Sequence, residues 1–205
     1  MNLPQKSARR PKGSGHLRRS EILEAAQRIF IEDGYQGATV RKIAQEVGVS
    51  STAIYMHFAD KLAMVSEIAA TAISQLLVQA RDIAAQPVDP AIRVRRMMVA
   101  HMRFALANRS AYSVVFGEAQ AEIKEGGAHS LGVDYYQCFA AVVGELARQD
   151  RLRGGRHPHA VAQIMWAGCH GLVTLLILNP DFGWMPVDEL TEAMAETLLA
   201  GALKP

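Results

Sequence analysis

Residues 40–58 read VRKIAQEVGVSSTAIYMHF, a pattern typical of two short helices joined by a tight turn. Gly48 can adopt the positive φ angle that such a turn needs, and the small Ala44 permits the two helices to cross closely. The apolar positions expected to form the packing face between the helices are Ile43, Val47, Val49 and Ile54. An apolar residue is also expected where His57 stands, so we assign that packing position to Phe58. The pattern therefore predicts a helix-turn-helix.

Helix start and stop signals extend this pattern in both directions. Apolar residues recur at helical spacing over residues 17–34 and predict a first amphipathic helix that stops at a glycine. Thr39 is a suitable N-cap for a helix through residue 47, and Ser50 for a helix to about residue 57. Asp60 is expected to cap a long helix over residues 61–85, which links two bodies of the protein.

Proline and glycine divide the remainder of the chain into further helices. Asp89-Pro90 is an N-cap followed by proline at the first helical position. The expected helices cover roughly residues 91–107, 110–122, 131–150, 158–178 and 188–202. No alternating strand pattern occurs. We therefore predict an all-α protein with a flexible basic arm (1–16), a three-helix helix-turn-helix domain (17–60) and a larger helical domain (61–205).

Composition agrees with this architecture and suggests a partner. The chain has 205 residues, of which 50% are hydrophobic and only 6% aromatic, so its apolar content favours helix. The first 20 residues contain no acidic residue and six basic ones, which are Lys6, Arg9, Arg10, Lys12, Arg18 and Arg19. A basic arm of this kind suits a polyanion, although a solvated terminus is the alternative.

The chain also carries signals about its compartment. The N-terminus is polar and basic with no apolar stretch behind it, so we expect no secretory signal and a cytoplasmic protein that binds no membrane. The longest apolar segment, Ile164 to Leu178, is shorter than the roughly 20 residues that span a bilayer, and we interpret it as a buried helix. Cys138 and Cys169 are expected to be reduced, buried thiols, with a redox-sensing pair as the alternative.

Residues 20–64 resemble the N-terminal domain of the TetR family of transcriptional regulators. The matching residues are Ile22-Leu23-x-Ala25-Ala26, Phe30, Gly34-Tyr35, Thr39-Val40-x-x-Ile43-Ala44, Val47-Gly48-Val49-Ser50, Ile54-Tyr55-x-His57-Phe58 and Lys61. The sequence departs from the family pattern at Thr52, where glycine is usual, and at Leu62, where an acidic residue is common. The resemblance implies a homodimeric regulator, most often a repressor, that binds a palindromic DNA operator and responds to a small molecule.

The helix after Ser50 is expected to read the DNA bases. A recognition helix presents small polar and methyl groups in the major groove, and the residues that suit this role are Ser51, Thr52, Ala53 and Met56. The helix has no Arg or Lys, so the bidentate contact to guanine is missing. Specificity must then come from hydroxyl groups, from methyl packing on thymine, or from Arg18 and Arg19 of the arm in a minor groove.

Phosphate contacts are expected on either side of that helix. By resemblance, they are made by Thr39, Tyr55, His57 and Lys61. Arg41 and Lys42, which are cationic at the start of the second helix, are further candidates, and so is Ser50 at the start of the third. The alternatives are that Tyr55 is mostly core, that His57 is a solvated helix end, and that Thr39 is only a cap.

The last two helices suit dimerisation, which two DNA half-sites require. One stripe contains Leu190, Ala193, Met194, Thr197, Leu198 and Gly201, and Gly168 and Gly171 on the preceding helix allow a close crossing. The resemblance implies that these helices form a four-helix bundle in the dimer. An internal core stripe is the alternative.

A ligand cavity is expected in the larger domain. The segment from Trp166 to Gly171 resembles the Trp-His-Gly (WHG) signature of one C-terminal subfamily, and Trp166 and His170 share a helix face. The other expected lining residues are Met98, His101, Met102, Tyr112, Phe116, Tyr135 and Phe139. Flexible Met and aromatic side chains without a charge cluster suit a mostly apolar, neutral ligand. Plain core packing is the alternative for all of them.

Two functions are alternatives to a ligand-responsive regulator. An enzyme is disfavoured because Cys169 and His170 are adjacent in a helix and point about 100° apart, and because no phosphate loop, nucleophile elbow or zinc motif occurs. No cofactor or metal is predicted, and His157-Pro-His159 is more typical of a helix start than of a metal site. The second rival is a dimeric helix-turn-helix DNA-binding protein without an inducer.

Overall fold

The computed structural model describes residues 15–113, 116 and 127–205, and in this part of the chain helices joined by turns and loops occur without any strand, which confirms the predicted all-α class. The chain divides into two compact units, residues 1–64 and 65–205. The division lies in the first turn of α4 (Lys61–Ala84), four residues after the expected boundary. The first 14 residues of the predicted basic arm (1–16) and the expected helix beyond Ser113, apart from Phe116, lie outside the described residues. The last two residues of that arm belong to α1, which begins two residues earlier than expected.

The first unit contains α1 (Gly15–Gly37), α2 (Val40–Val47), α3 (Ser51–Tyr55) and the first turn of α4. The three helices enclose a small apolar core made of Ile22, Ala25, Ala26, Phe30, Ile43, Ala44, Ile54 and Phe58. Phe58 is buried as predicted, whereas His57 is only half-buried. Gly48 has a φ angle of 73° and ends α2, and Gly34 has a φ angle of 69° and interrupts α1 where the sequence predicts a stop.

The predicted caps make the expected hydrogen bonds. Thr39 Oγ1 accepts from the amide of Lys42 at 3.2 Å, and Ser50 Oγ accepts from the amide of Ala53 at 3.2 Å. The α3 helix ends at Tyr55, two residues earlier than expected, because the amides of residues 57 and 58 both turn back to the carbonyl of Ile54. The α3 helix therefore has only five residues, or about one and a half turns.

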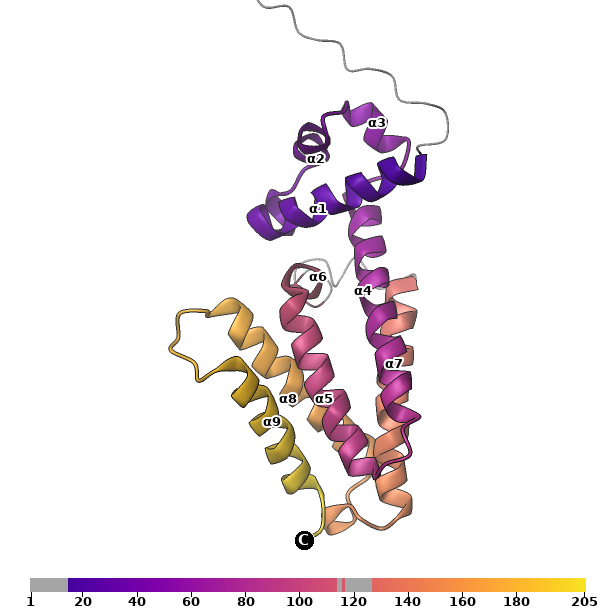
Figure 1. Ribbon diagram of the computed structural model, residues 1–205, viewed down its shortest axis with the longest axis vertical. Coiled ribbons are helices and arrows are strands. Elements are labelled where there is room, and N and C mark those ends of the chain that lie inside the picture. Colours follow the sequence, from indigo (N-terminus) through magenta and orange to yellow (C-terminus); the bar gives the residue numbers. More distant parts are fainter. Residues whose placement is uncertain (1–14, 114–115, 117–126) are drawn as a thin grey trace, which may run out of the picture. The chain divides into compact units, whose positions relative to one another are not determined.

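The second unit is a bundle of the remaining helices (Figure 1). They are most of α4, α5 (Pro90–Ala107), the short α6 (Arg109–Ser113), α7 (Gly127–Arg148), α8 (Pro158–Leu178) and α9 (Val187–Ala202). The central helix is α5, which packs against α7, α8 and α9, and α8 and α9 lie side by side. The main differences from the sequence prediction are that α6 is only five residues long and that α7 begins at residue 127 instead of 131.

Two of the described helices, α4 and α8, are long and apolar enough to cross a membrane, but a core helix of a soluble protein passes the same test. One face of α8 is buried, with Met165, Cys169 and Val173 in the core. Its other face exposes Ile164 (58%) and Leu178 (69%). The expectation of a buried helix over residues 164–178 is therefore correct for one face only.

An ion pair joins three helices of the second unit. The Arg93 guanidinium on α5 is bidentate to the Glu145 carboxylate on α7, at 3.1 and 2.5 Å, and also donates to the carbonyl of Ala84 at the end of α4, at 2.7 Å. Only 11% of the Arg93 side chain is exposed. A partly buried, bidentate pair of this kind is strongly destabilising when one partner is removed.

We therefore expect Glu145→Gln to lower the free energy of unfolding of the second unit by about 1–3 kcal/mol, because the Arg93 charge loses its counter-ion. Urea titration followed by tryptophan fluorescence measures it, since both tryptophans, Trp166 and Trp184, lie in this unit. The control is Glu196→Gln, which breaks the exposed pair with Arg95 (3.0 Å) and should cost less than about 0.5 kcal/mol. Equal losses in both variants would contradict the assigned role.

Candidate nucleic-acid interface and ligand cavity

The outer face of α3 exposes uncharged side chains. Tyr55 is 56% exposed and Met56, just after the helix, is 82% exposed, while Thr52 is also exposed. Ser51 and Ala53 are half-buried, and Ser50 uses its hydroxyl as the helix cap. Ile54, on the opposite side, is fully buried and attaches the helix to the core. The structure thus leaves tyrosyl, thioether, hydroxyl and methyl groups available on one side of a short helix.

The start of α2 carries cationic candidates. Arg41 and Lys42 are both exposed. The Lys42 ammonium group binds the Asp33 carboxylate at 2.8 Å and donates to the carbonyl of Gly37 at 3.1 Å, whereas Arg41 makes no side-chain ion pair or hydrogen bond within the part of the chain that the structure describes. Thr39 is exposed, and its hydroxyl already serves as the cap.

Two residues predicted to contact DNA have partners within the first unit. Arg19 lies within α1 rather than in an arm; its guanidinium donates to the carbonyl of His57 at 2.5 Å and lies 4.1 Å from the centre of the Phe58 ring. Lys61 donates to the carbonyl of Tyr35 at 2.5 Å and lies over the Tyr35 ring at 4.0 Å. Both side chains stabilise the first unit where they lie.

Arg18 and His57 also have neighbours within the first unit. Arg18 lies in α1, not in an arm, and pairs with Glu21 at 3.2 Å. The His57 side chain is half-buried, and it is the backbone carbonyl of this residue that binds Arg19. No local sequence signal identifies these roles, because Arg19 and Lys61 bind carbonyl groups 38 and 26 residues away.

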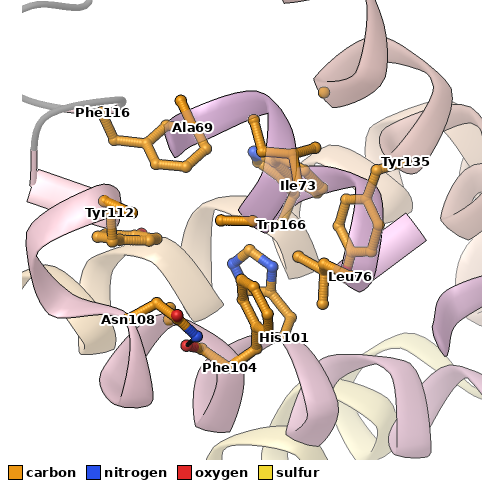
Figure 2. Close-up of a pocket in the computed structure, with 14 residues that line it drawn as sticks. Ala69, Ile73, Leu76, His101, Phe104, Asn108, Tyr112, Phe116, Tyr135 and Trp166 are labelled. Carbon is orange, nitrogen blue, oxygen red and sulfur yellow. Dashed lines mark hydrogen bonds between the residues drawn. The ribbon is translucent and has the colours of Figure 1, made fainter. Parts of the chain in front are cut away.

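A small, nearly apolar cavity of about 40 Å³ lies in the second unit (Figure 2). The predicted residues that line it are His101, Tyr112, Phe116, Tyr135 and Trp166. Phe104 of α5 also lines it. The lining residues that sequence reasoning missed are Ala69, Ala72, Ile73 and Leu76 of α4, together with Ala105, Asn108, Ala111 and Gly132. Helical spacing marks the α4 residues as one face, and this is the only sequence signal that they carry.

Four other predicted ligand contacts do not line this cavity. Met98, Met102 and Phe139 are buried in the core of the second unit, because their side of the helix faces other helices rather than the cavity. His170 lies next to the lining residues, with its ring centre 4.7 Å from that of Trp166 and 4.7 Å from that of His101. A hydrogen bond joins its Nδ1 to the Tyr112 hydroxyl.

Burial determines the charge of the groups around the cavity. It lowers the pKa of His101 to about 3, with a further contribution from the charge of His170, and it lowers the pKa of His170 to about 4. Burial also raises the pKa of Tyr112 to about 12 and raises that of Tyr135. All four side chains are therefore uncharged near neutral pH.

The neighbouring groups do not form a reactive centre. Burial raises the pKa of the Cys169 thiol to about 12, so the thiol stays protonated beside His170. Both cysteines are free thiols, and Cys138 is half-buried rather than buried. His157 caps α8 by accepting from the amide of His159 at 3.3 Å, and no cluster of metal-ligating side chains occurs in the described ranges.

The exposed face of α8 forms a continuous apolar stripe. Its residues follow helical spacing and are Ile164, Gly168, Gly171, Leu175 and Leu178. A Cβ atom on Gly168 would come within 3.0 Å of Leu198, so this glycine permits the packing of α8 on α9 within one chain. A Cβ atom on Gly171 or Gly201 would meet open space. On α9, Leu190, Met194 and Leu198 pack on the core, whereas Ala193 and Thr197 are exposed.

Comparison with known proteins agrees with both units. Residues 22–68 match the family model described as bacterial regulatory proteins, tetR family. Residues 94–200, about half of the chain, match the model described as tetracyclin repressor-like, C-terminal domain. The chain belongs to the TetR family. Its relatives are regulators of transcription and not enzymes.

Individual relatives are similar over part of their length. The transcriptional repressor AcnR of Corynebacterium diphtheriae is 46% identical over 80 residues, which cover 35% of this chain and 42% of that protein. The transcriptional repressor KstR2 of Mycobacterium tuberculosis is 35% identical over 109 residues, which cover 53% of this chain and 54% of that protein. The chain thus spans about half of the length of these curated relatives or less.

The fold of this TetR-family chain matches solved structures over almost its full length. The ketosteroid transcriptional regulator KstR2 of Mycobacterium tuberculosis superposes with a TM-score of 0.75, covering 92% of this chain and 96% of that one. At 22% identity this likeness establishes the shared fold alone.

The two buried histidines predict a pH dependence of stability. Their pKa values in the folded chain lie below the ordinary histidine value of about 6.5, so the unfolded chain binds more protons once the pH falls below about 6.5. We expect each histidine to remove about 2 kcal/mol of unfolding free energy between pH 7.5 and pH 5.

Urea titration of the second unit at both pH values measures this loss. His101→Leu should remove roughly half of the histidine-dependent part, because one of the two titrating groups is gone. An acid-induced loss that is the same in His101→Leu as in the parent protein would contradict the assignment.

Proposed function

We propose that the chain is a dimeric repressor that binds a palindromic DNA operator through α3 and leaves it when a small, mostly apolar ligand occupies the cavity of the second unit. The observation that carries this proposal is the exposed, uncharged face of α3, which a buried isoleucine attaches to the core. A protein of this type acts in the cytoplasm.

Base reading is assigned to Thr52 and Met56, whose side chains are exposed at α3, and the exposed Tyr55 beside them stays assigned to a DNA phosphate. Hydroxyl and thioether groups can form hydrogen bonds and methyl contacts with base edges in the major groove. Ser51 and Ala53, which are half-buried, are assigned to closer contacts with the same groove. The chain would then discriminate bases by several modest contacts instead of one arginine–guanine pair.

Phosphate binding is assigned to the start of α2. Arg41 is exposed and has no competing side-chain partner among the described residues, so it is the strongest candidate. The first amides of α2, with Thr39 at the cap, form a further site for an anion. Lys42 must exchange its contact with Asp33 to join them, and Lys61 and Arg19 are assigned to support of the helices rather than to DNA.

Dimerisation is assigned to the apolar stripe of α8 and the exposed positions of α9. Ile164, Leu175 and Leu178 are large apolar side chains exposed in a row, and Gly171 leaves room for a second helix. Phe182 and Met185, in the connection to α9, extend the exposed apolar surface. Contiguous patches of this kind mark protein interfaces, and a twofold dimer places two reading helices on two half-sites.

Release of DNA is assigned to α4. This helix begins in the first unit, where Lys61 binds the Tyr35 carbonyl, and continues into the second, where Ala69, Ile73 and Leu76 line the cavity. A ligand can weaken DNA binding only if it binds better to a conformation that misfits the operator. A ligand that displaces the cavity-lining residues of α4 would favour a conformation of this kind. The ring contact between Trp166 and His170, with centres 4.7 Å apart, also supports the assignment to the Trp-His-Gly (WHG) subfamily.

The second candidate function is a dimeric DNA-binding protein without an inducer. The observation that favours it is the cavity volume of about 40 Å³, which is far below the roughly 300–1,000 Å³ of usual ligand sites. A ligand must therefore enlarge the cavity on binding. A protein that never does so would keep its operator affinity with every small molecule tested.

DNA binding can be tested without knowing the operator. Selection of duplexes from a random pool by the purified chain should enrich a palindromic sequence. Arg41→Ala should weaken binding to all duplexes and reduce the slope of log affinity against log salt by about 1, whereas Thr52→Ala should change the enriched sequence and leave that slope unchanged.

Arg148→Ala is the matched control, because it removes the same charge from an exposed position on α7 in the second unit and should change neither quantity. Failure to enrich any sequence would overturn the function. An unchanged salt slope in Arg41→Ala would overturn only the phosphate assignment.

The dimer surface makes a separate prediction. Leu175→Glu should raise the dissociation constant of the dimer at least about 100-fold, because the interface would bury an unpaired carboxylate. Sedimentation measures the mass, which is 22.3 kDa for one chain. Val133→Glu changes a similarly exposed apolar residue on α7 and should leave the dimer intact. A dimer that withstands Leu175→Glu would refute this surface.

A further inference from the structure

His101 is a buried polar side chain without a hydrogen-bond partner. It lies on α5, only 5% of it is exposed, and neither ring nitrogen has a partner. The same ring lines the cavity, where Figure 2 shows it between Phe104, Trp166 and Leu76. Buried polar groups are nearly always satisfied, so an unsatisfied one that faces a cavity points to a partner that the chain does not supply.

The surrounding side chains cannot satisfy this imidazole. Its nearest aromatic neighbours are the rings of His170, Trp166 and Tyr135, at centre-to-centre distances of 4.7, 5.4 and 5.6 Å. Their contacts with His101 are stacked, tilted or edge-on ring contacts. The one amide at the cavity, Asn108, donates to the carbonyl of Phe104 at 2.8 Å. The His101 nitrogens therefore remain available to a ligand atom.

The cavity also contains no charged group. None of its lining residues is Lys, Arg, Asp or Glu. Burial keeps the imidazole neutral by lowering the pKa of His101 to about 3. A neutral imidazole has one donor and one acceptor nitrogen, which is the complement of a hydroxyl group or, through the donor alone, of a carbonyl group. A carboxylate or phosphate would enter an apolar space with no cation to balance it.

We propose, on the basis of the effector cavity assigned above, that the effector is an uncharged and largely apolar molecule whose one hydroxyl or carbonyl group pairs with the His101 imidazole. The hydrogen bond gives the ligand its orientation, and the surrounding aromatic side chains bind the hydrocarbon part. A purely apolar molecule leaves the imidazole unsatisfied and binds less well for that reason.

Phe104 is the side chain that can give the ligand room. The cavity of about 40 Å³ is close to the volume of one water molecule, so it accommodates the polar group but not a larger body. Phe104 lines this cavity and also a larger groove of about 530 Å³ between α4, α5 and α9. Because Phe104 borders both spaces, a change of its rotamer would open one toward the other. Two arginines of that groove are paired with carboxylates, Arg95 with Glu192 at 2.7 Å and Arg103 with Asp188 at 3.1 Å. The third, Arg96, donates to the amide oxygen of Gln86.

Fluorescence of Trp166 tests the proposal directly. In a Trp184→Phe background, Trp166 is the single tryptophan and lies at the cavity. The three probes are cyclohexanol, methylcyclohexane and cyclohexanecarboxylate, which are similar in size and differ in one group. At neutral pH cyclohexanol should bind more tightly than either of the other two.

His101→Leu should shift the ratio of the cyclohexanol and methylcyclohexane dissociation constants by at least about tenfold toward the hydrocarbon, because the hydroxyl loses its partner. Retained methylcyclohexane binding in this variant shows that the cavity is intact. Phe104→Ala should strengthen binding of both probes and leave their ratio unchanged. His101→Asn, which keeps a donor and an acceptor, should restore part of the preference for cyclohexanol.

Each other outcome has a distinct meaning. If the carboxylate binds most tightly, or if His101→Leu leaves the ratio unchanged, the assignment of an uncharged ligand to His101 is overturned while the effector cavity stands. If none of the probes binds to the parent protein or to Phe104→Ala, the effector cavity itself is overturned, and this inference with it.

Discussion

A helix of five residues such as α3 cannot persist alone, because helix nucleation costs more than so few hydrogen bonds return. Its geometry is imposed by the burial of Ile54 against the first unit, by the Ser50 cap at its start, and by Arg19, which binds the His57 carbonyl just beyond its end. These three contacts hold the backbone at both termini and at one face. The exposed side chains of α3 can then point outward in a defined direction without contributing to the stability of the helix themselves.

The second unit depends on a different balance. Its central helix α5 carries apolar residues toward α7, α8 and α9, and it also places His101 among aromatic rings without a hydrogen bond. A neutral imidazole in this position is tolerated because the surrounding packing is extensive, but it leaves the cavity as the least satisfied part of the unit. The Arg93–Glu145 pair lies near the start of α5, whereas α6 with Tyr112 follows its end. This pair attaches α4 and α7 to α5.

Sequence reasoning succeeded where the signal is local. Thr39, Ser50 and Asp60 cap helices through amides three residues away, and Gly48 ends a helix by its own φ angle, so each can be identified from its neighbours in the chain. The same holds for the helix-turn-helix and for the order of the helices. Of the candidate site, the sequence could indicate which residues share a helix face.

The sequence could not indicate what that face meets. Met102 and His101 are adjacent and both buried, yet only His101 lines the cavity, because the difference lies in the packing of neighbouring helices. Lys61 and Arg19 have the cationic side chains expected of phosphate ligands, and nothing in the sequence indicates that both also bind carbonyl groups distant in the chain. Ala69 and Ala72 of α4 were missed because a small residue on an apolar stripe carries no chemical signal of a ligand.

The separation of Ile54 from Thr52 and Met56 on α3 has a consequence for how such proteins diversify. Ile54, which holds the helix in place, faces inward, and Thr52 and Met56, which are assigned to base reading, face outward. Substitutions at the outward positions leave the scaffold untouched, so gene copies can acquire new target sites by small steps, each of which remains a folded protein. Such a protein can therefore keep its fold while the DNA sequence that it binds changes, because different residues of one short helix determine the two properties.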